Sequence, residues 1–128
     1  MTGFCDSIED LTKQNSYFRK VLFTGKHCQL VLMTLKPGEE IGAEVHDNVD
    51  QFFRFEEGEG KVVIEDSEYA VKDSFAVIVP AGSRHNVINT SQTDSLKLYT
   101  IYSPPNHPDG TIHKTKEETE IYEREQHK

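Results

Sequence analysis

Apolar and polar residues follow each other in short runs over most of the chain, and Gly, Pro, Asn, Asp or Ser ends each run. Runs of this length at regular spacing are typical of strands in a β-sandwich or barrel. The predicted strands cover residues 17–23, 28–35, 41–46, 51–55, 60–65, 67–71, 76–79, 85–89 and 96–102. The sequence therefore predicts an all-β fold.

The run 29–35 is apolar at nearly every position, which indicates a strand covered on both faces. The run 60–65 ends in charge instead. This contrast between strands predicts two packed layers. A single core is expected, because 128 residues is a common size for one domain. We therefore predict a single domain, 1–128, with a barrel core over about 17–102.

The two ends of the chain have a different pattern from the middle. Ser7 precedes the acidic pair Glu9 and Asp10, which favours a short helix over 7–15. Three prolines in 103–113 remove ladder donors and predict a loop there. Residues 115–126 then predict a charged C-terminal helix whose apolar contacts are Ile121 and Tyr122.

Composition excludes several classes of partner. The net charge of -8 repels phosphate backbones and anionic lipid, so neither nucleic acid nor membrane is an expected partner. No apolar run approaches the ~20 residues that a membrane helix needs. The first residues also lack the basic start and apolar stretch of a secretory signal, so a cytoplasmic location is expected.

Candidate chemistry lies in two stretches of the predicted barrel. Glu44 and His46 are two positions apart and would share one face of a strand. Gln51 begins the next strand, and alternation places it on the same face as Phe53 and Phe55. His85 opens a later strand after a tight turn. These residues predict polar groups above an aromatic floor inside the barrel.

The second stretch resembles a motif of the cupin family, which reads G, five residues, PxG, two residues, H, three residues, N. Its matching residues are Pro80, Gly82, His85 and Asn89, and Ser74 stands where the family has its leading Gly. The first stretch resembles the other cupin motif, which reads G, five residues, HxH, three or four residues, E, six residues, G. Six residues separate Gln51 from Gly58, and four separate His46 from Gln51. By this register, His46 takes the second His position, Glu44 replaces the first His, and Gln51 replaces the Glu.

The resemblance covers about 36–102 and implies a double-stranded β-helix, or jelly-roll barrel, that is often a homodimer. It also implies one divalent metal ion inside the barrel, with Glu44, His46, Gln51 and His85 as ligands. Two imidazoles with oxygen donors favour Zn, Mn or Fe over soft metals. An empty polar pocket is the alternative, but burying Glu44 without a cation would cost several kcal/mol.

The whole chain is similar to small bacterial-type cupins that are compared with mannose-6-phosphate isomerase, through the run Phe52, Phe53, Arg54 and the loop 103–113. That similarity implies a metal-dependent enzyme acting on a small polar molecule, sugar-like or an oxo or hydroxy compound. A sugar isomerase and a non-haem iron dioxygenase remain alternatives, and no catalytic residue is identified. A non-catalytic module that binds a small ligand is the hypothesis from another class.

Other residues are candidates for the pocket wall or for a lid. Phe53 and Phe55 would form the wall, although any barrel would place them in its core. His107 and His113 could line the mouth of the barrel, or they could decorate a surface turn. A phosphorylated substrate would need a basic anchor, and Arg54 and Arg84 are the arginines near the motifs.

Overall fold

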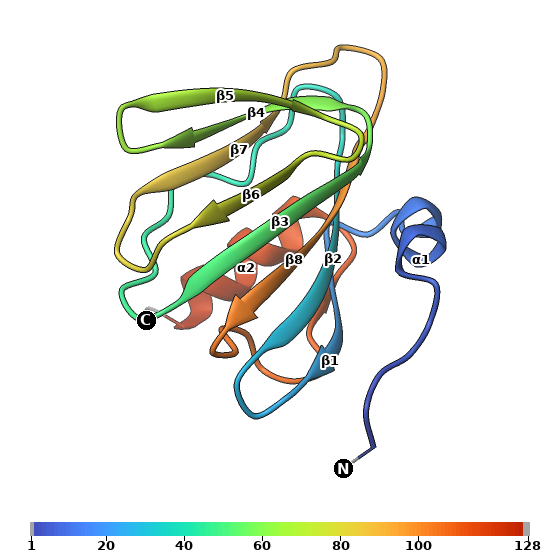
Figure 1. Ribbon diagram of the computed structural model, residues 1–128, viewed down its shortest axis with the longest axis vertical. Coiled ribbons are helices and arrows are strands. Elements are labelled where there is room, and N and C mark those ends of the chain that lie inside the picture. Colours follow the sequence, from blue (N-terminus) through green and yellow to red (C-terminus); the bar gives the residue numbers. More distant parts are fainter. Residues whose placement is uncertain (1, 127–128) are drawn as a thin grey trace.

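The computed structural model describes residues 2–126 and has two antiparallel sheets that face each other (Figure 1). The elements are α1 (Ile8–Gln14), β1 (Arg19–Thr24), β2 (Gln29–Leu35), β3 (Asp50–Glu57), β4 (Glu59–Ile64), β5 (Ser67–Lys72), β6 (Ala76–Val79), β7 (His85–Asn89), β8 (Leu96–Ser103), β9 (Ile112–His113) and α2 (Lys116–Gln126). The six-stranded sheet has the order β6-β3-β8-β2-β1-β9 and the three-stranded sheet the order β5-β4-β7. The predicted β-rich fold with one short helix at each end is confirmed.

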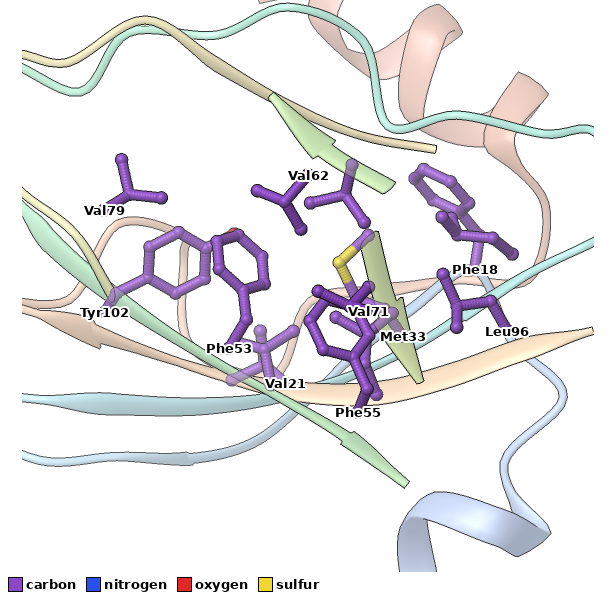
Figure 2. Close-up of a cluster of buried hydrophobic side chains, with 14 of the residues drawn as sticks. Phe18, Val21, Met33, Phe53, Phe55, Val62, Val71, Val79, Leu96 and Tyr102 are labelled. Atoms are coloured by element: carbon purple, nitrogen blue, oxygen red, sulfur yellow. The ribbon is translucent and has the colours of Figure 1, made fainter. Parts of the chain in front are cut away.

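The core lies between the two sheets and is built from alternate positions of the strands. Phe53 and Phe55 on β3 are fully buried, whereas Phe52 and Arg54, on either side of Phe53, are only partly covered. Figure 2 shows Phe53 and Tyr102 toward one end of this cluster and Phe18 toward the other. The period of two that the sequence shows is thus the period of burial.

Strand β2 is covered on both faces, as its apolar run predicted. Its inward residues join the core, and its outward residues Leu32 and Thr34 are also buried. Thr34 exchanges hydrogen bonds with Asn15, which follows α1, at 3.0 Å and 2.8 Å. The N-terminal segment therefore covers the outer face of the large sheet.

The predicted strand 41–46 is wrong. This stretch contributes only isolated bridges, Glu40 to Ile88 and Glu44 to His85. Gly42 between them has φ +105°, which an extended strand does not contain. The backbone therefore leaves the ladder after each single bridge.

The predicted loop 103–113 contains a strand that the sequence did not indicate. Ile112 and His113 form β9, which pairs with Lys20 and Arg19 of β1. Before β9, the buried side chain of Gln29 accepts hydrogen bonds from the backbone N–H groups of residues 106 and 107 and donates one to the His107 carbonyl, at 3.1, 3.0 and 2.8 Å. The loop is therefore fastened to β2.

Helix α2 packs through polar contacts, and the prediction that Ile121 packs inward is wrong because that side chain is 38% exposed. Thr119 is the buried residue of the helix, and its hydroxyl lies 2.7 Å from Nδ1 of His113. Tyr122 lies against the ring of His113, with 5.5 Å between the centroids. Within residues 2–126, no helix is long and apolar enough to cross a membrane.

Gly58 and Gly82, one from each motif, both have positive φ, +96° and +85°. An added Cβ on Gly58 would lie 2.5 Å from the Ser95 carbonyl oxygen, whereas one on Gly82 would meet nothing within 4 Å. Both positions favour glycine because of their positive φ. At Gly58 the close packing of Ser95 also leaves no room for a side chain.

We predict that Gly82→Ala lowers the free energy of unfolding by roughly 1–2 kcal/mol, the usual cost of a left-handed L-residue. Gly58→Ala should lower it by a further ~1–3 kcal/mol, because Ser95 must also move. Urea denaturation of the two variants beside the wild type checks the difference. Equal losses would show that crowding at Ser95 is unimportant.

His107 points into the barrel, where its Nε2 lies 3.2 Å from the hydroxyl of Tyr102. Burial, together with the positive charge of Arg19, lowers the pKa of His107 to about 3. An unfolded chain restores an ordinary pKa near ~6.5. Between these two values the unfolded state takes up a proton that the folded state does not, so His107 reduces stability as the pH falls.

Accordingly, the free energy of unfolding of the wild type should fall between pH 7 and pH 4, and His107→Gln should flatten that fall by up to ~3 kcal/mol. Denaturation curves at several pH values measure both slopes. His27→Gln, at an exposed position, is the control and should keep the wild-type slope. Parallel curves for all three proteins would contradict the burial of His107 as the cause.

Candidate functional site

The two segments that carry the predicted site are joined by their backbones. Glu44 and His85 exchange two backbone hydrogen bonds, at 2.8 Å and 2.9 Å. The carbonyl of His46 accepts a third, at 2.9 Å, from the N–H of Gly82 in the turn before β7. The side chains of both segments therefore start from neighbouring positions in space.

His46 is the centre of the resulting cluster. Its Nε2 lies 2.9 Å from Oε2 of Glu44, and its ring centroid lies 5.4 Å from that of His85. The edge of Tyr102 faces the same imidazole, with 5.9 Å between the centroids. The structure thus brings Glu44, His46 and His85 together, and it adds Tyr102 from β8.

His85 is held in one orientation. Its Nδ1 lies 3.0 Å from the carbonyl oxygen of Ser83, and a carbonyl can only accept, so Nδ1 carries the proton. In the neutral tautomer with this proton, Nε2 carries the lone pair through which an imidazole binds a metal. The ring edge of Phe53 lies beside His85 at 6.2 Å, and Phe55 stacks behind Phe53 at 6.4 Å. Phe53 is therefore the wall residue, and Phe55 belongs to the core.

Gln51 is buried at the start of β3, paired with Tyr102 on one side and Val79 on the other. Its amide nitrogen donates to Oγ1 of Thr100 at 3.0 Å. Its amide oxygen, Oε1, is buried and has no hydrogen-bond partner among the described residues. A buried acceptor in this state loses its hydration and gains nothing in exchange.

Unsatisfied polar atoms gather in the barrel interior. In the part of the chain from 2 to 126, four buried side-chain atoms lack a hydrogen-bond partner, and three of them are Nε of Arg19, Nε2 of His46 and Oε1 of Gln51. The close approach of His46 to Glu44 is therefore a contact of charge and dipole without hydrogen-bond alignment. The fourth atom, Nε of Arg54, lies 2.8 Å from Glu56. Buried groups without partners mark a place where a ligand, ion or water is expected.

The pKa of Glu44 is set by burial and by neighbouring groups that act in opposite directions. Burial raises the pKa of Glu44, but contact with His46 and the positive charge of Arg19 outweigh it, and the net pKa is lowered. Glu44 is therefore ionised at neutral pH. Burial raises the pKa of Tyr102 to about 12 against the opposing charge of Arg19, so Tyr102 keeps its proton.

The described side chains do not form a ready coordination shell. Among residues 2–126, no group of three or more His, Cys, Asp or Glu side chains is arranged to hold a metal ion. Nε2 of His46 and Oε2 of Glu44 lie 2.9 Å apart, and the ring of His85 lies 5.4 Å from that of His46, centroid to centroid. The donor types fit a divalent metal, and the unpartnered His46 Nε2 and Gln51 Oε1 fit a missing ligand.

Three of the other sequence candidates lie elsewhere. His113 pairs with β1 and bonds to Thr119, so it anchors α2 and does not touch His46 or His85. Arg84 is exposed, and Arg54 pairs with Glu56 with its side chain 37% exposed. His107 does approach the cluster through Tyr102, with 5.0 Å between the two ring centroids.

Arg19 and Tyr102 are site residues that sequence reasoning missed. Arg19 is 2% exposed and shares the inward face of β1 with Val21. Its charge acts on the pKa of Glu44, Tyr102 and His107. The sequence did contain a signal for Arg19. It lies two positions before Val21 in a strand, and residues two apart in a strand share one face.

Comparisons with known proteins agree with this architecture. The family model for the cupin domain matches residues 31–102. The uncharacterized protein YrkC of Bacillus subtilis (strain 168) is 54% identical over 119 residues, which cover 88% of this chain and 63% of that protein. Protein L612 of Acanthamoeba polyphaga mimivirus is 43% identical over 109 residues, 83% of this chain and 68% of its own. The chain thus spans less than two-thirds of the length of YrkC.

A solved structure extends the likeness to three dimensions. The crystal structure of BH2720 from Bacillus halodurans has a TM-score of 0.91 and 45% sequence identity, over 94% of this chain and 95% of that one. A Klebsiella pneumoniae protein with a double-stranded β-helix domain shares the fold at a TM-score of 0.69 and 16% identity, over 88% and 98% of the two chains. The matched family model covers more than half of the chain, and the motif residues from His46 to Asn89 lie inside it. The chain belongs to the cupin domain family.

Proposed function

We propose that the barrel binds one divalent metal ion through Glu44, His46, Gln51 and His85, and that the protein is a metal-dependent enzyme for a small polar substrate. The observation that carries the proposal is the pair of buried atoms without a partner, Nε2 of His46 and Oε1 of Gln51, beside an ionised carboxylate. A cation between these groups would satisfy both atoms and neutralise Glu44.

The donor set supports Zn, Mn or Fe. Two imidazoles, one carboxylate and one amide oxygen are borderline to hard donors, which suit these ions better than copper(I). Ser83 supports His85 as a ligand, since its carbonyl holds the Nδ1 proton and orients the ring. When bound, such an ion polarises a carbonyl or hydroxyl oxygen of the substrate or activates bound water.

Residues of the chain supply the rest of the site. Tyr102 keeps its phenol proton at neutral pH and lies against His46, so it can donate a hydrogen bond to a substrate oxygen. His107, neutral at the same pH, lies 3.2 Å from that hydroxyl and can orient it through a hydrogen bond. A sugar isomerase and a dioxygenase both remain within the proposal.

A second candidate function is a metal-free module that binds a small molecule. It is favoured by one observation: within residues 2–126 no three ionisable or thiol ligands are arranged around a common point. Glu44 also has His46 as a neighbour at 2.9 Å, which partly compensates its charge without an ion. Metal binding separates the two candidates.

We expect the purified protein, stripped with chelator, to bind about one Zn²⁺, Mn²⁺ or Fe²⁺ per chain by calorimetry. His85→Ala should weaken that binding by roughly 100-fold or more, because a ligand contributes at least as much as the residues that orient it. His27→Ala removes an exposed imidazole and should leave the affinity unchanged. Absence of binding in the wild type would favour the metal-free module, and equal loss in both variants would exclude the assigned site.

Gln51→Glu tests the fourth ligand through stability alone. A second buried carboxylate lowers the melting temperature of the metal-free protein at pH 7, because burying the charge is unfavourable. A bound divalent ion should reverse that loss, so added metal should raise the melting temperature more in the variant than in the wild type. Gln92→Glu adds the same charge at an exposed position and should respond like the wild type. The same metal response in all three proteins would remove Gln51 from the ligand set.

A further inference from the structure

Arg19 is a buried cation without a matching anion. It is 2% exposed, its Nε has no hydrogen-bond partner, and its side-chain contacts are with two hydroxyls, that of Thr119 at 3.4 Å from Nη1 and that of Tyr102. The guanidinium lies over the ring of Phe18 at 5.4 Å. Among residues 2–126, no carboxylate oxygen lies within the 4.0 Å of an ion pair with it.

A buried guanidinium without an anionic partner is energetically unfavourable. An arginine cannot lose its proton in a protein, so burial does not neutralise it as it would a histidine. A buried charge is normally paired, because its desolvation is expensive. The positive charge of Arg19 helps to lower the pKa of Glu44, so this carboxylate is close enough to interact with it. Oε2 of Glu44, however, lies against His46. The guanidinium therefore keeps free donors.

Those donors lie at a hollow in the protein. A cavity of about 240 Å³ is bounded by Phe18 and Arg19 of the β1 end, by the segment 41–44, and by α2. Glu44 lines this cavity and also belongs to the histidine cluster. One molecule could therefore reach Arg19 at one end and the cluster at the other. A larger cavity of about 530 Å³, along Gly58, Glu59, Lys72, Asp73, Ser91 and Asp94, contains none of these groups.

We propose that the cavity beside Arg19 binds the carboxylate of a small organic acid, with the guanidinium as its bidentate anchor. Guanidinium and carboxylate match in shape and form two parallel charge-assisted hydrogen bonds. The cavity is smaller than the ~300–1,000 Å³ of sites for drug-sized ligands, which favours an acid of a few carbons. This assignment rests on the proposed function in taking the same molecule to be the ligand of the metal site.

Charge favours a carboxylate over a phosphate. One guanidinium balances one negative charge, whereas a phosphate group carries about -1.5 to -2 at neutral pH. Lys116 also lines the cavity, but so do the acidic Glu44, Glu120 and Glu123. These three acidic residues together would repel a dianion. A monoanion is repelled less, and the exposed side chains of Glu120 and Glu123 can point into solvent when it binds.

The test is calorimetric binding of the monoanions glycolate and lactate, with glycolamide, lactamide and inorganic phosphate as comparison ligands. Each is titrated into metal-free protein and into protein with added Zn²⁺. We expect at least one of the two carboxylates to bind, and the amides, which keep the shape without the charge, to bind at least about tenfold more weakly. This comparison uses wild-type protein only, so it does not depend on whether a variant folds.

Variants then assign the binding to Arg19. Arg19→Gln should weaken carboxylate binding roughly 10- to 100-fold. Arg19→Lys, which keeps the charge without the planar fork, should lose less. Lys26→Gln removes the same charge at an exposed position and should bind like the wild type. Zn²⁺ affinity without acid is measured for each variant and should not fall, because Arg19 is not a proposed ligand of the metal.

The possible results separate this proposal from the metal site. Equal binding of acids and amides, equal carboxylate affinity in Arg19→Gln and wild type, or tighter binding of phosphate would overturn the carboxylate site. Failure of the wild type to bind either glycolate or lactate under both metal conditions would do the same. Carboxylate binding that needs Arg19 in a protein that binds no metal would support the anchor and reject the metal-dependent function.

Discussion

The pair of backbone hydrogen bonds between Glu44 and His85 is the contact on which the site depends. The two residues come from segments about forty positions apart, and these bonds make them direct neighbours. The segment around Glu44 is not part of a continuous strand, and single hydrogen bonds from the N–H groups of Ile41 and Gly42 to Val87 and Asn86, both at 2.9 Å, also hold it against β7. At Gly42 the backbone turns away from β7, and at Glu44 it pairs with β7 again. His46 is thereby brought to His85, and both face the core wall formed by Phe53.

The barrel interior beside this contact contains buried polar atoms that no group among the described residues pairs. Arg19, His46 and Gln51 each carry a buried atom without a hydrogen-bond partner, although native proteins pair nearly all such atoms. The surrounding residues are well satisfied: Gln29 clamps the loop before β9, and the amide of Asn89 donates to three backbone carbonyls at one strand end. The unpaired groups are therefore concentrated at one place. That concentration favours a bound ligand over general looseness of the fold.

Local pattern predicted most of the barrel. Alternation correctly placed Gln51, Phe53 and Phe55 on one inward face and left Arg54 outside, because each strand turns successive side chains to opposite faces. Alternation also suggested a strand at 41–46, and there it failed, because Gly42 adopts a backbone angle that no periodicity reveals. Ile121 was expected to pack inward, but the helix that carries it turns its small Thr119 toward β9 and leaves Ile121 exposed.

The sequence by itself determined the β-rich class, the motif spacing that identifies the cupin family, and the residue types available to a metal. Spacing along a strand sets which side chains share a face, so these properties are local. Only the tertiary structure decided that Arg19 lies near the histidine cluster, that His107 is held inside by Gln29, and that Arg84 stays outside. Those positions depend on which strands pair across the barrel, and pairing between distant segments is not encoded in any one of them.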